Sequence, residues 1–333
     1  MKILFYCPLS FNLVGKKNNL LGGIETLNLE LSKEIAKKKH KVYLATLTNK
    51  TFIKDNVINI PIKKILKNHK MLNFDIIISS NDPSIFNKYK NAKKFYWMHN
   101  TLSLEKSVRK KKFLSLLTNK ITTIFVSKYL KNITSKLYLF NKRIVIPNFL
   151  PKLFTSNEVI KKRKPIFVWS VQRDKGLAET INTWINEIYP INRYAKFYIF
   201  GVKKKPKNLS YKILLNKNIH FFGRVSKRKL KNIYQKSMAM ICLGYDETFC
   251  LNALEANSCG LPVITFGKTA LGEMVIDKKN GLVADNFNDL AKKIKYLIFL
   301  RSKQRLKFIR NSYLNSKKYN LKNIIYLWLK LLK

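Results

Sequence analysis

Short apolar runs, rich in β-branched and aromatic residues, alternate with segments of helical periodicity from the first residue onward. Between the first two runs, Ile24, Leu27, Leu31 and Ile35 recur at helical intervals. This alternation is typical of parallel sheets whose strands are joined by crossover helices. Seven runs in the first half of the chain are predicted to be strands: KILFYCP, KVYLATL, VINIPI, FDIIISS, KKFYWMH, TTIFVS and RIVIPN.

The alternation is interrupted once and then starts again. The break, SNEVIKKRKPIF, is polar and strongly basic and carries Pro165. Five predicted strands follow it, in IFVWSV, KFYIFG, IHFFGRV, AMICLGY and PVITF, and 333 residues exceed the usual size of one core. We therefore expect an α/β fold of two Rossmann-like, doubly wound domains, residues 1–160 and 161–315. They should face a central cleft at the carboxyl ends of both sheets.

Residues 316–333 are predicted to form a C-terminal helix. Its apolar side chains cover a wide arc of the helix surface: Leu321, Ile324, Ile325, Trp328, Leu331 and Leu332. This pattern favours a helix that crosses back to the N-terminal domain. A helix lying on a membrane surface is the alternative.

The charge of the chain is extreme. Sixty-six Lys and Arg against 18 Asp and Glu give a net charge of +48. Two explanations stay open: biased composition on solvated faces, or an anionic partner as well. The basic segment HNTLSLEKSVRKKKF offers the same choice, between a solvated helix face and contact with the phosphates of an acceptor or a membrane.

Cysteine usage and hydropathy indicate the compartment. Cys7, Cys242, Cys250 and Cys259 lack the spacing of a zinc site and are predicted to be buried thiols in a reducing compartment. The start MKILFYCPLSF is predicted to be a buried strand and not a signal peptide, and no run approaches the ~20 apolar residues of a membrane span. We expect a cytoplasmic protein, with peripheral binding to the cytosolic face of a membrane as the second possibility.

Two acids in the segment DETFCLNALEANSCGLPVI raise the question of function. Glu247 precedes an apolar helical run that is predicted to begin near Phe249, and Glu255 lies inside it. Eight residues at ~1.5 Å rise separate the acids by about 12 Å, whereas paired glycosidase carboxylates lie roughly 5 to 9.5 Å apart. The separation suits two hydroxyl-rich rings joined by a diphosphate, facing the amides of the helix start. A solvated loop acid and an ordinary helix acid remain the alternative.

The segment resembles the E-x7-E motif of retaining GT-B glycosyltransferases, in particular glycosyltransferase family 4. Further stretches similar to that family follow in its order: GGIETL, WMHN, FVSK, IPNF and FFGRV. The resemblance thus covers nearly the whole chain. It implies a nucleotide-sugar donor, retention of anomeric configuration by front-face attack, and no metal or other cofactor.

The resemblance also implies roles for individual residues. Glu247 would accept hydrogen bonds from the transferred sugar, and Glu255 from the nucleotide ribose, since a carboxylate can hold a vicinal diol. His99 would face the transferred sugar. Gly22 and Gly23 would let the backbone approach the diphosphate, although a plain turn into a helix explains them as well. The rest of the expected donor segment is Thr248, Phe249, Cys250 and Leu251.

The donor diphosphate needs cations in a site without metal. WSVQRDKGLAET supplies Lys175 and Arg173, but the family's usual arginine position holds Ser170, so Arg173 is only a possible substitute. Arg224 in FFGRV is a further donor-site candidate, or else a surface charge. With Lys175 stabilising the leaving group, the expected catalytic set is Lys175, Arg173, His99 and Glu247.

The sequence therefore predicts a glycosyltransferase that moves a sugar to a hydroxyl of a cell-envelope glycan or lipid-linked acceptor, with an anionic membrane surface as a further partner. A nucleotide-sugar epimerase of the same architecture is the alternative enzyme. A basic nucleic-acid-binding protein is the alternative outside enzymes, but it would have no use for the two acids. No specific nucleic acid is expected as a partner.

Overall fold

The structure, a computed structural model, divides into two compact units. One contains Met1–Pro151 together with Leu321–Lys333, and the other contains Lys152–Asn320. The first boundary lies after Pro151, nine residues before the predicted one at residue 160. The second lies after Asn320, five residues after the predicted one at residue 315. Residues 1–8, 21–69, 71–101, 104–137, 142–155, 162–171, 175–202, 205 and 209–333 are described, without the side chains of residues 104 and 107.

The N-terminal unit is built on an eight-stranded sheet of order β3-β4-β2-β1-β5-β6-β7-β8. All neighbouring pairs are parallel except β3 with β4. The strand order reverses between β1 and β5, so the carboxyl ends of these two strands form the switch point of the sheet. The strands are β1 (Lys2–Tyr6), β2 (Lys41–Thr46), β3 (Phe52–Lys54), β4 (Val57–Pro61), β5 (Ile76–Ser80), β6 (Lys93–Met98), β7 (Ile121–Phe125) and β8 (Lys142–Val145).

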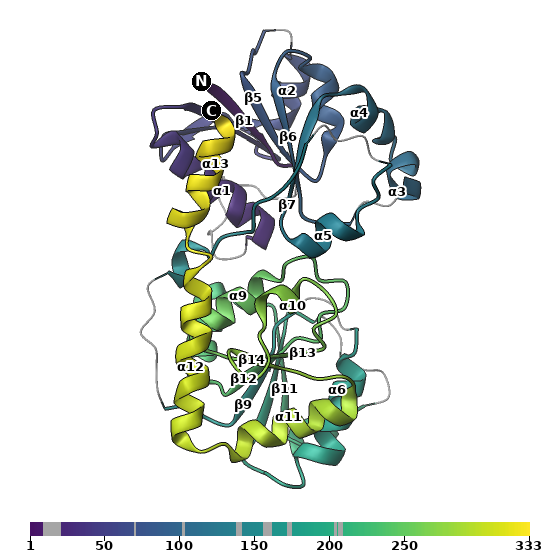
Figure 1. Ribbon diagram of the computed structural model, residues 1–333, viewed down its shortest axis with the longest axis vertical. Helices are drawn as coiled ribbons and strands as arrows, with labels where there is room; N and C mark the ends of the chain where they lie inside the picture. Colours follow the sequence, from purple (N-terminus) through teal and green to yellow (C-terminus); the bar gives the residue numbers. More distant parts are fainter. Residues whose placement is uncertain are drawn as a thin grey trace. The chain divides into compact units, whose positions relative to one another are not determined.

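Helices cover both faces of this sheet. α1 (Gly23–Ala36) and the C-terminal α13 (Leu321–Leu332) lie together on one face, and α2 (Ile62–Lys67) and α4 (Phe113–Thr118) lie on the other (Figure 1). α13 buries Ile324, Trp328 and Leu332, and Trp328 packs edge-on against Trp97 with ring centroids 4.9 Å apart. Apolar burial of this kind attaches the end of the chain to the N-terminal unit. The short elements are η2 (Pro83–Lys88), α3 (Leu104–Arg109) and α5 (Lys128–Ile133).

The C-terminal unit is built on a six-stranded parallel sheet of order β11-β10-β9-β12-β13-β14. Its order reverses between β9 and β12, which places a second switch point at the carboxyl ends of those strands. Buried residues fill the central strands, as expected for a parallel sheet covered on both faces. The strands are β9 (Ile166–Trp169), β10 (Lys196–Phe200), β11 (Ile219–Gly223), β12 (Ala239–Ile241), β13 (Val263–Thr265) and β14 (Gly281–Val283).

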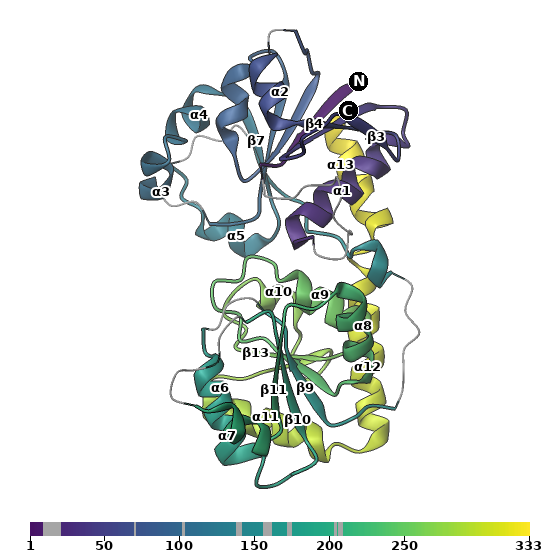
Figure 2. The same ribbon diagram turned by 180° about the vertical axis from the view of Figure 1, so that it is seen from behind.

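Helices again lie on both faces of the sheet. Figure 2 shows α8, α9 and α12 on one face and α6, α7 and α11 on the other. The N-termini of α8 and α11 are capped by Ser226 and Asn286, whose side-chain oxygens accept from backbone N–H groups three residues on. The elements are η3 (Lys152–Phe154), α6 (Leu177–Thr183), the π-helical η4 (Trp184–Ile188), α7 (Tyr211–Asn216), α8 (Lys227–Lys236), α9 (Leu251–Ser258), α10 (Leu271–Met274), α11 (Phe287–Phe299) and α12 (Ser302–Lys317).

The predicted α/β class with two parallel sheets is confirmed, and each of the twelve predicted strands overlaps an observed one. Two strands escaped prediction, β3 (FIK) and β14 (GLV), each three residues long. All four cysteines are buried, and they form no disulfide with one another. Within the ranges given above, no helix has the length and apolarity that a membrane span requires.

Candidate functional site

Two loops meet at the switch point of the C-terminal unit. One follows β9 and carries Lys175, and the other follows β12 and carries Tyr245 and Asp246. The Lys175 ammonium lies 3.3 Å from the Asp246 carboxylate and 5.3 Å from the centroid of the Tyr245 ring. Both members of the ion pair are more than half exposed, so the pair adds little to stability and leaves the cation reachable from solvent.

Gly176 allows this close approach. Its φ of +83° is left-handed, and a Cβ built there would lie 2.6 Å from a Leu243 methyl carbon and 2.8 Å from the Tyr245 ring. Any other residue would meet both strain and a clash. Gly176 therefore lets the segment after β9 pack against the loop after β12, and it is the residue directly before the first turn of α6.

The loop after β12 has an unusual backbone. Gly244, Asp246 and Cys250 all have positive φ, at +87°, +55° and +62°. Asp tolerates this conformation, but for Cys it is costly, and such strain gathers at functional sites. The Thr269 hydroxyl donates to the Gly244 carbonyl at 2.8 Å, and the Ala270 amide donates to the Glu247 carbonyl at 3.3 Å. The loop is thus held in place from the neighbouring β13 connection.

The donor segment predicted from sequence divides into exposed and buried side chains. Glu247, Thr248 and Leu251 are partly exposed. Phe249 is buried edge-on against Tyr319, and the Cys250 sulfur lies 3.6 Å from that of Cys242. This contact with the Cys242 thiol, and then burial, raise the pKa of Cys250 well above its ordinary value. The side chains of Phe249 and Cys250 therefore pack in the interior, and only their backbone groups could contact a ligand.

α9 carries the second acid. The helix spans Leu251–Ser258 and begins two residues after the predicted start near Phe249. Gly260, two residues past its end, has the left-handed φ of +71° that favours glycine after a helix. The Glu255 side chain is only 2% exposed, and its two oxygens accept from the Lys227 ammonium at 2.8 and 2.6 Å. Burial raises the pKa of Glu255, whereas Lys227 lowers it. This acid is the centre of a buried ion pair and not an ordinary helix acid.

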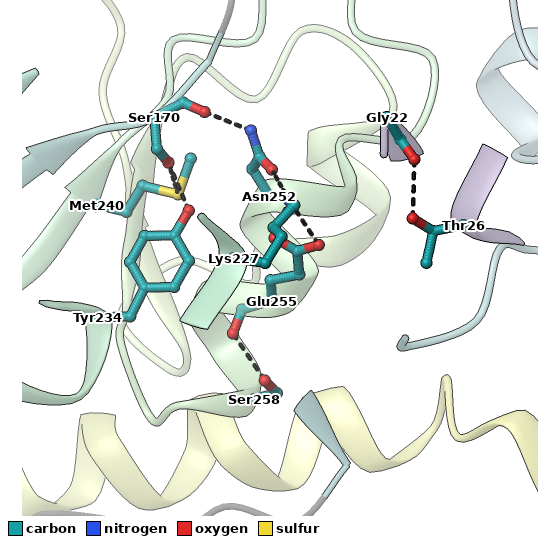
Figure 3. A network of polar contacts seen from close by, with 9 residues as sticks. All are labelled: Gly22, Thr26, Ser170, Lys227, Tyr234, Met240, Asn252, Glu255 and Ser258. Carbon is teal, nitrogen blue, oxygen red and sulfur yellow. Dashed lines mark hydrogen bonds and ion pairs between the residues drawn. The ribbon is translucent and has the colours of Figure 1, made fainter. Parts of the chain in front are cut away.

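Polar contacts extend from this pair to the end of β9 (Figure 3). Lys227 also donates to the Asn252 side-chain oxygen at 2.9 Å, and the Asn252 amide donates to the Ser170 carbonyl. The Ser170 hydroxyl lies 2.6 Å from that of Tyr234, whose pKa burial and the nearby Glu255 raise. Ser170, which occupies the expected arginine position, is thus joined through Asn252 to Lys227.

Lys227 and Asn252 were missed by sequence reasoning. The i, i+3 spacing of Asn252 and Glu255 puts both on one helix face and would have paired them. Nothing distinguishes Lys227 in a chain with so many lysines, apart from its place at the first position of a helix capped by Ser226.

The structure gives little support for a role of the two predicted arginines at the site. Arg224 follows β11 directly and is exposed. Arg173 lies outside the described residues. No cluster of three or more His, Cys, Asp or Glu with metal-binding geometry occurs among the residues that the structure describes.

The remaining predicted residues belong to the N-terminal unit. Gly22 caps α1 in an ordinary extended conformation with φ −70°, so its backbone needs no glycine, and the Glu25 carboxylate fills the space beside it. Gly23 is the first residue of α1. The Gly22 carbonyl accepts from the Thr26 hydroxyl at 2.9 Å, a local contact also drawn in Figure 3.

His99 directly follows β6 and is buried. Its backbone N–H donates to the Asn81 side chain at 2.8 Å, and its ring packs on Trp97 with centroids 4.6 Å apart. Burial lowers its pKa to about 3, so the imidazole is neutral near pH 7. In this state it can hydrogen-bond but cannot supply positive charge.

Two parallel-sheet units, with loops gathered at the carboxyl end of each sheet, are the architecture of GT-B glycosyltransferases. WaaG, described as a glycosyltransferase involved in lipopolysaccharide biosynthesis, is 14% identical with a TM-score of 0.71, over 99% of each chain. HepE (Alr3699) of Anabaena, solved in complex with UDP-glucose, is 13% identical with a TM-score of 0.69, over 100% of this chain and 99% of that one. Identities this low show the shared fold alone.

The C-terminal unit gives a more specific match. Residues 154–315 match the family model Glycosyl transferases group 1 and thus form a domain of that family. MJ1178 of Methanocaldococcus jannaschii, named an uncharacterized glycosyltransferase, is 32% identical over 202 residues. The match spans 59% of this chain and 55% of that protein, hence about half the length of the relative. These matches support a transferase enzyme.

Proposed function

We propose that the protein is a retaining glycosyltransferase, similar to glycosyltransferase family 4, that transfers a sugar from a nucleotide-sugar donor. One observation carries the proposal. At the switch point of a Glycosyl transferases group 1 domain, the exposed cation Lys175 lies beside the loop that carries Glu247. Ligands of doubly wound sheets bind at such switch points, and HepE was solved with UDP-glucose. UDP-glucose is therefore the first donor to test.

In this proposal different residues of the C-terminal unit bind different parts of the donor. Lys175 neutralises the diphosphate as it leaves, aided by Arg173, with Arg224 as a further phosphate contact. Glu247, partly exposed, accepts hydrogen bonds from hydroxyls of the transferred sugar. The backbone N–H groups at the start of α9, around Cys250 and Leu251, add positive partial charge near the phosphates.

Glu255 is proposed to hold the ribose. A carboxylate offers about four lone-pair sites, so the two bonds from Lys227 leave capacity for a diol. The Glu255 side chain is only 2% exposed, whereas the Lys227 side chain is 31% exposed. In this proposal the ribose therefore reaches Glu255 by displacing Lys227 from one carboxylate oxygen. Lys227 also favours the ionised form of the acid, since it lowers the pKa that burial raises.

The N-terminal unit is proposed to bind the acceptor, with Gly22, Gly23 and His99 directed to the donor as the family resemblance implies. The acceptor class is a hydroxyl of a cell-envelope glycan or of a lipid-linked precursor. The fold shared with WaaG, a protein of lipopolysaccharide biosynthesis, supports this class. A cytoplasmic location, free or on the cytosolic face of a membrane, and independence from metal ions complete the proposal.

Thermal unfolding in the presence of a panel of nucleotide sugars tests the proposal, because a ligand that binds the native state raises its stability by RT ln(1 + [L]/Kd). We expect at least one sugar nucleotide, UDP-glucose first, to raise the midpoint, with no loss of the effect in EDTA. Incubation with that donor alone should leave its sugar configuration unchanged. A flat response to the whole panel, or an isomerised donor, would contradict a transferase.

A further inference from the structure

A second polar site lies at the other switch point, in the N-terminal unit. A cavity of about 260 Å³ opens where the carboxyl ends of β1 and β5 meet, between Pro8 and Ser80. Doubly wound sheets bind ligands at this place. None of the roles proposed above uses the cavity, although its position in the N-terminal unit is equivalent to that of the donor site in the C-terminal unit.

The charge of the cavity wall is strongly positive. Lys106, Lys110 and Lys112 line it, from α3 and the turn that follows, and Asp82 is the single acid among the described lining residues. One oxygen of Asp82 already accepts from Lys112 at 3.3 Å and from the Ser84 amide and hydroxyl at 3.1 and 2.7 Å. The acid is therefore compensated locally, and the wall has an excess of two positive charges.

Neutral polar groups complete the wall. Asn81 accepts the His99 backbone N–H with its side-chain oxygen at 2.8 Å, which leaves the amide NH2 as the donor end. Ser80 is fully buried, and its hydroxyl donates to Asn28 at 3.0 Å. Tyr96, Asn100 and Thr101 also line the cavity and can donate as well as accept. The three lysines make the difference, since ammonium groups bind charged phosphate oxygens more strongly than neutral sugar hydroxyls.

We propose that this cavity binds a phosphate or diphosphate group of the acceptor, with Lys106 and Lys110 as the main contacts and Lys112 held by Asp82 as the third. The proposal rests on the proposed function, because it names the substrate class of the same enzyme: an acceptor glycan or lipid that carries phosphate. It also gives the basic segment after β6 a specific role, apart from the overall charge of +48.

The probe is inorganic pyrophosphate, titrated calorimetrically into the full chain with saturating UDP present to occupy the donor diphosphate site. Lys110→Glu reverses a charge in the cavity. Lys120→Glu makes the same change at an exposed lysine just before β7, at the amino end of that strand and therefore at the end of the sheet opposite the cavity. We expect pyrophosphate affinity to fall on the order of tenfold in Lys110→Glu and to stay unchanged in Lys120→Glu. Equal losses in both variants, or no loss in either, would overturn the proposal.

Two further measurements identify the source of the phosphate and separate this proposal from the proposed function. Sedimentation with phosphatidylglycerol vesicles should be equal for wild type and Lys110→Glu; loss of vesicle binding with intact pyrophosphate binding would assign the lysines to a membrane surface and overturn the cavity site. UDP binding is measured separately. Its absence would exclude a UDP-sugar donor, and a flat response to the whole nucleotide-sugar panel would refute the transferase, while pyrophosphate binding lost in Lys110→Glu would still support an anion site.

Discussion

The two switch points of this molecule share one backbone plan and differ in charge. In the C-terminal unit, the loop after β12 carries Glu247 and lies beside Lys175, and the following helix α9 carries Glu255, which pairs with Lys227. In the N-terminal unit, the cavity at β1 and β5 presents three lysines and one acid that is already compensated. On the proposed assignment, the same fold binds hydroxyls and phosphate together in one unit and an anion alone in the other.

This difference shows where specificity is encoded. The parallel sheet decides that a ligand binds at its carboxyl end, and the few side chains on the loops decide which ligand it is. If the comparison is right, charge changes in the C-terminal unit should affect the donor, and charge changes in the N-terminal unit should affect the acceptor.

Lys175→Ala should have the largest effect. Removing the cation that stabilises the leaving diphosphate should lower the rate of sugar transfer roughly 10²- to 10³-fold, as loss of one group that stabilises developing charge does. Initial rates with a saturating donor would measure it. Asp246→Asn is the matched control, because it breaks the same ion pair and keeps the cation. Equal losses in the two variants would mean that Lys175 acts only through Asp246.

Lys227→Met should have the next largest effect, on stability. It leaves the Glu255 carboxylate buried without its counter-charge, which should cost about 3 kcal/mol of unfolding free energy near pH 8. The pKa of Glu255, already raised by burial, should rise further in this variant. The native state then binds a proton that the unfolded state has lost, so stability should fall as pH increases above about 4.5.

Urea unfolding at pH 5 and pH 8 measures this dependence. We expect the loss relative to wild type to be smaller at pH 5 than at pH 8. In the double variant Lys227→Met with Glu255→Gln, which removes both charges, the loss relative to wild type should differ little between the two pH values. An equal loss at the two pH values in the single variant would show that Lys227 packs there without compensating the acid.

Gly176→Ala should destabilise the protein by about 2 kcal/mol, since it combines a left-handed φ with contacts of 2.6 and 2.8 Å. Gly223→Ala separates the two causes, because Gly223 has φ +60° but nothing within 4 Å of the added carbon. Its cost should be about 1 kcal/mol. Thermal unfolding would compare them, and a Gly176 variant no worse than the Gly223 variant would refute the tight packing of the two loops.

Glu247→Gln should have the smallest effect of the four. One acceptor oxygen remains, so kcat/KM for transfer should fall about tenfold through weaker bonds to sugar hydroxyls. Affinity for UDP, which lacks the sugar, should not change. Calorimetry with UDP and kinetics with the complete donor would separate these effects, and a variant that lost UDP affinity would place Glu247 at the nucleotide instead.

Sequence patterns predicted much of the fold because its strands are long apolar runs in a regular alternation. They predicted the meeting of Lys175 with the acidic loop only through family resemblance, since residues 175 and 246 are brought together by strand order, which periodicity does not reveal. The partner of Glu255 was also hidden. A lysine 28 positions earlier carries no local signal in so basic a chain. The cavity in the N-terminal unit required coordinates, because it collects residues from four separate segments.

The division between a donor site in the C-terminal unit and an anion site in the N-terminal unit is tested most directly by calorimetric titration of UDP-glucose into wild type, Lys175→Ala and Lys110→Glu. We predict binding to wild type, at least tenfold weaker binding to Lys175→Ala, and wild-type affinity in Lys110→Glu. Weakening by Lys110→Glu as great as that by Lys175→Ala, or wild-type affinity in Lys175→Ala, would contradict the account.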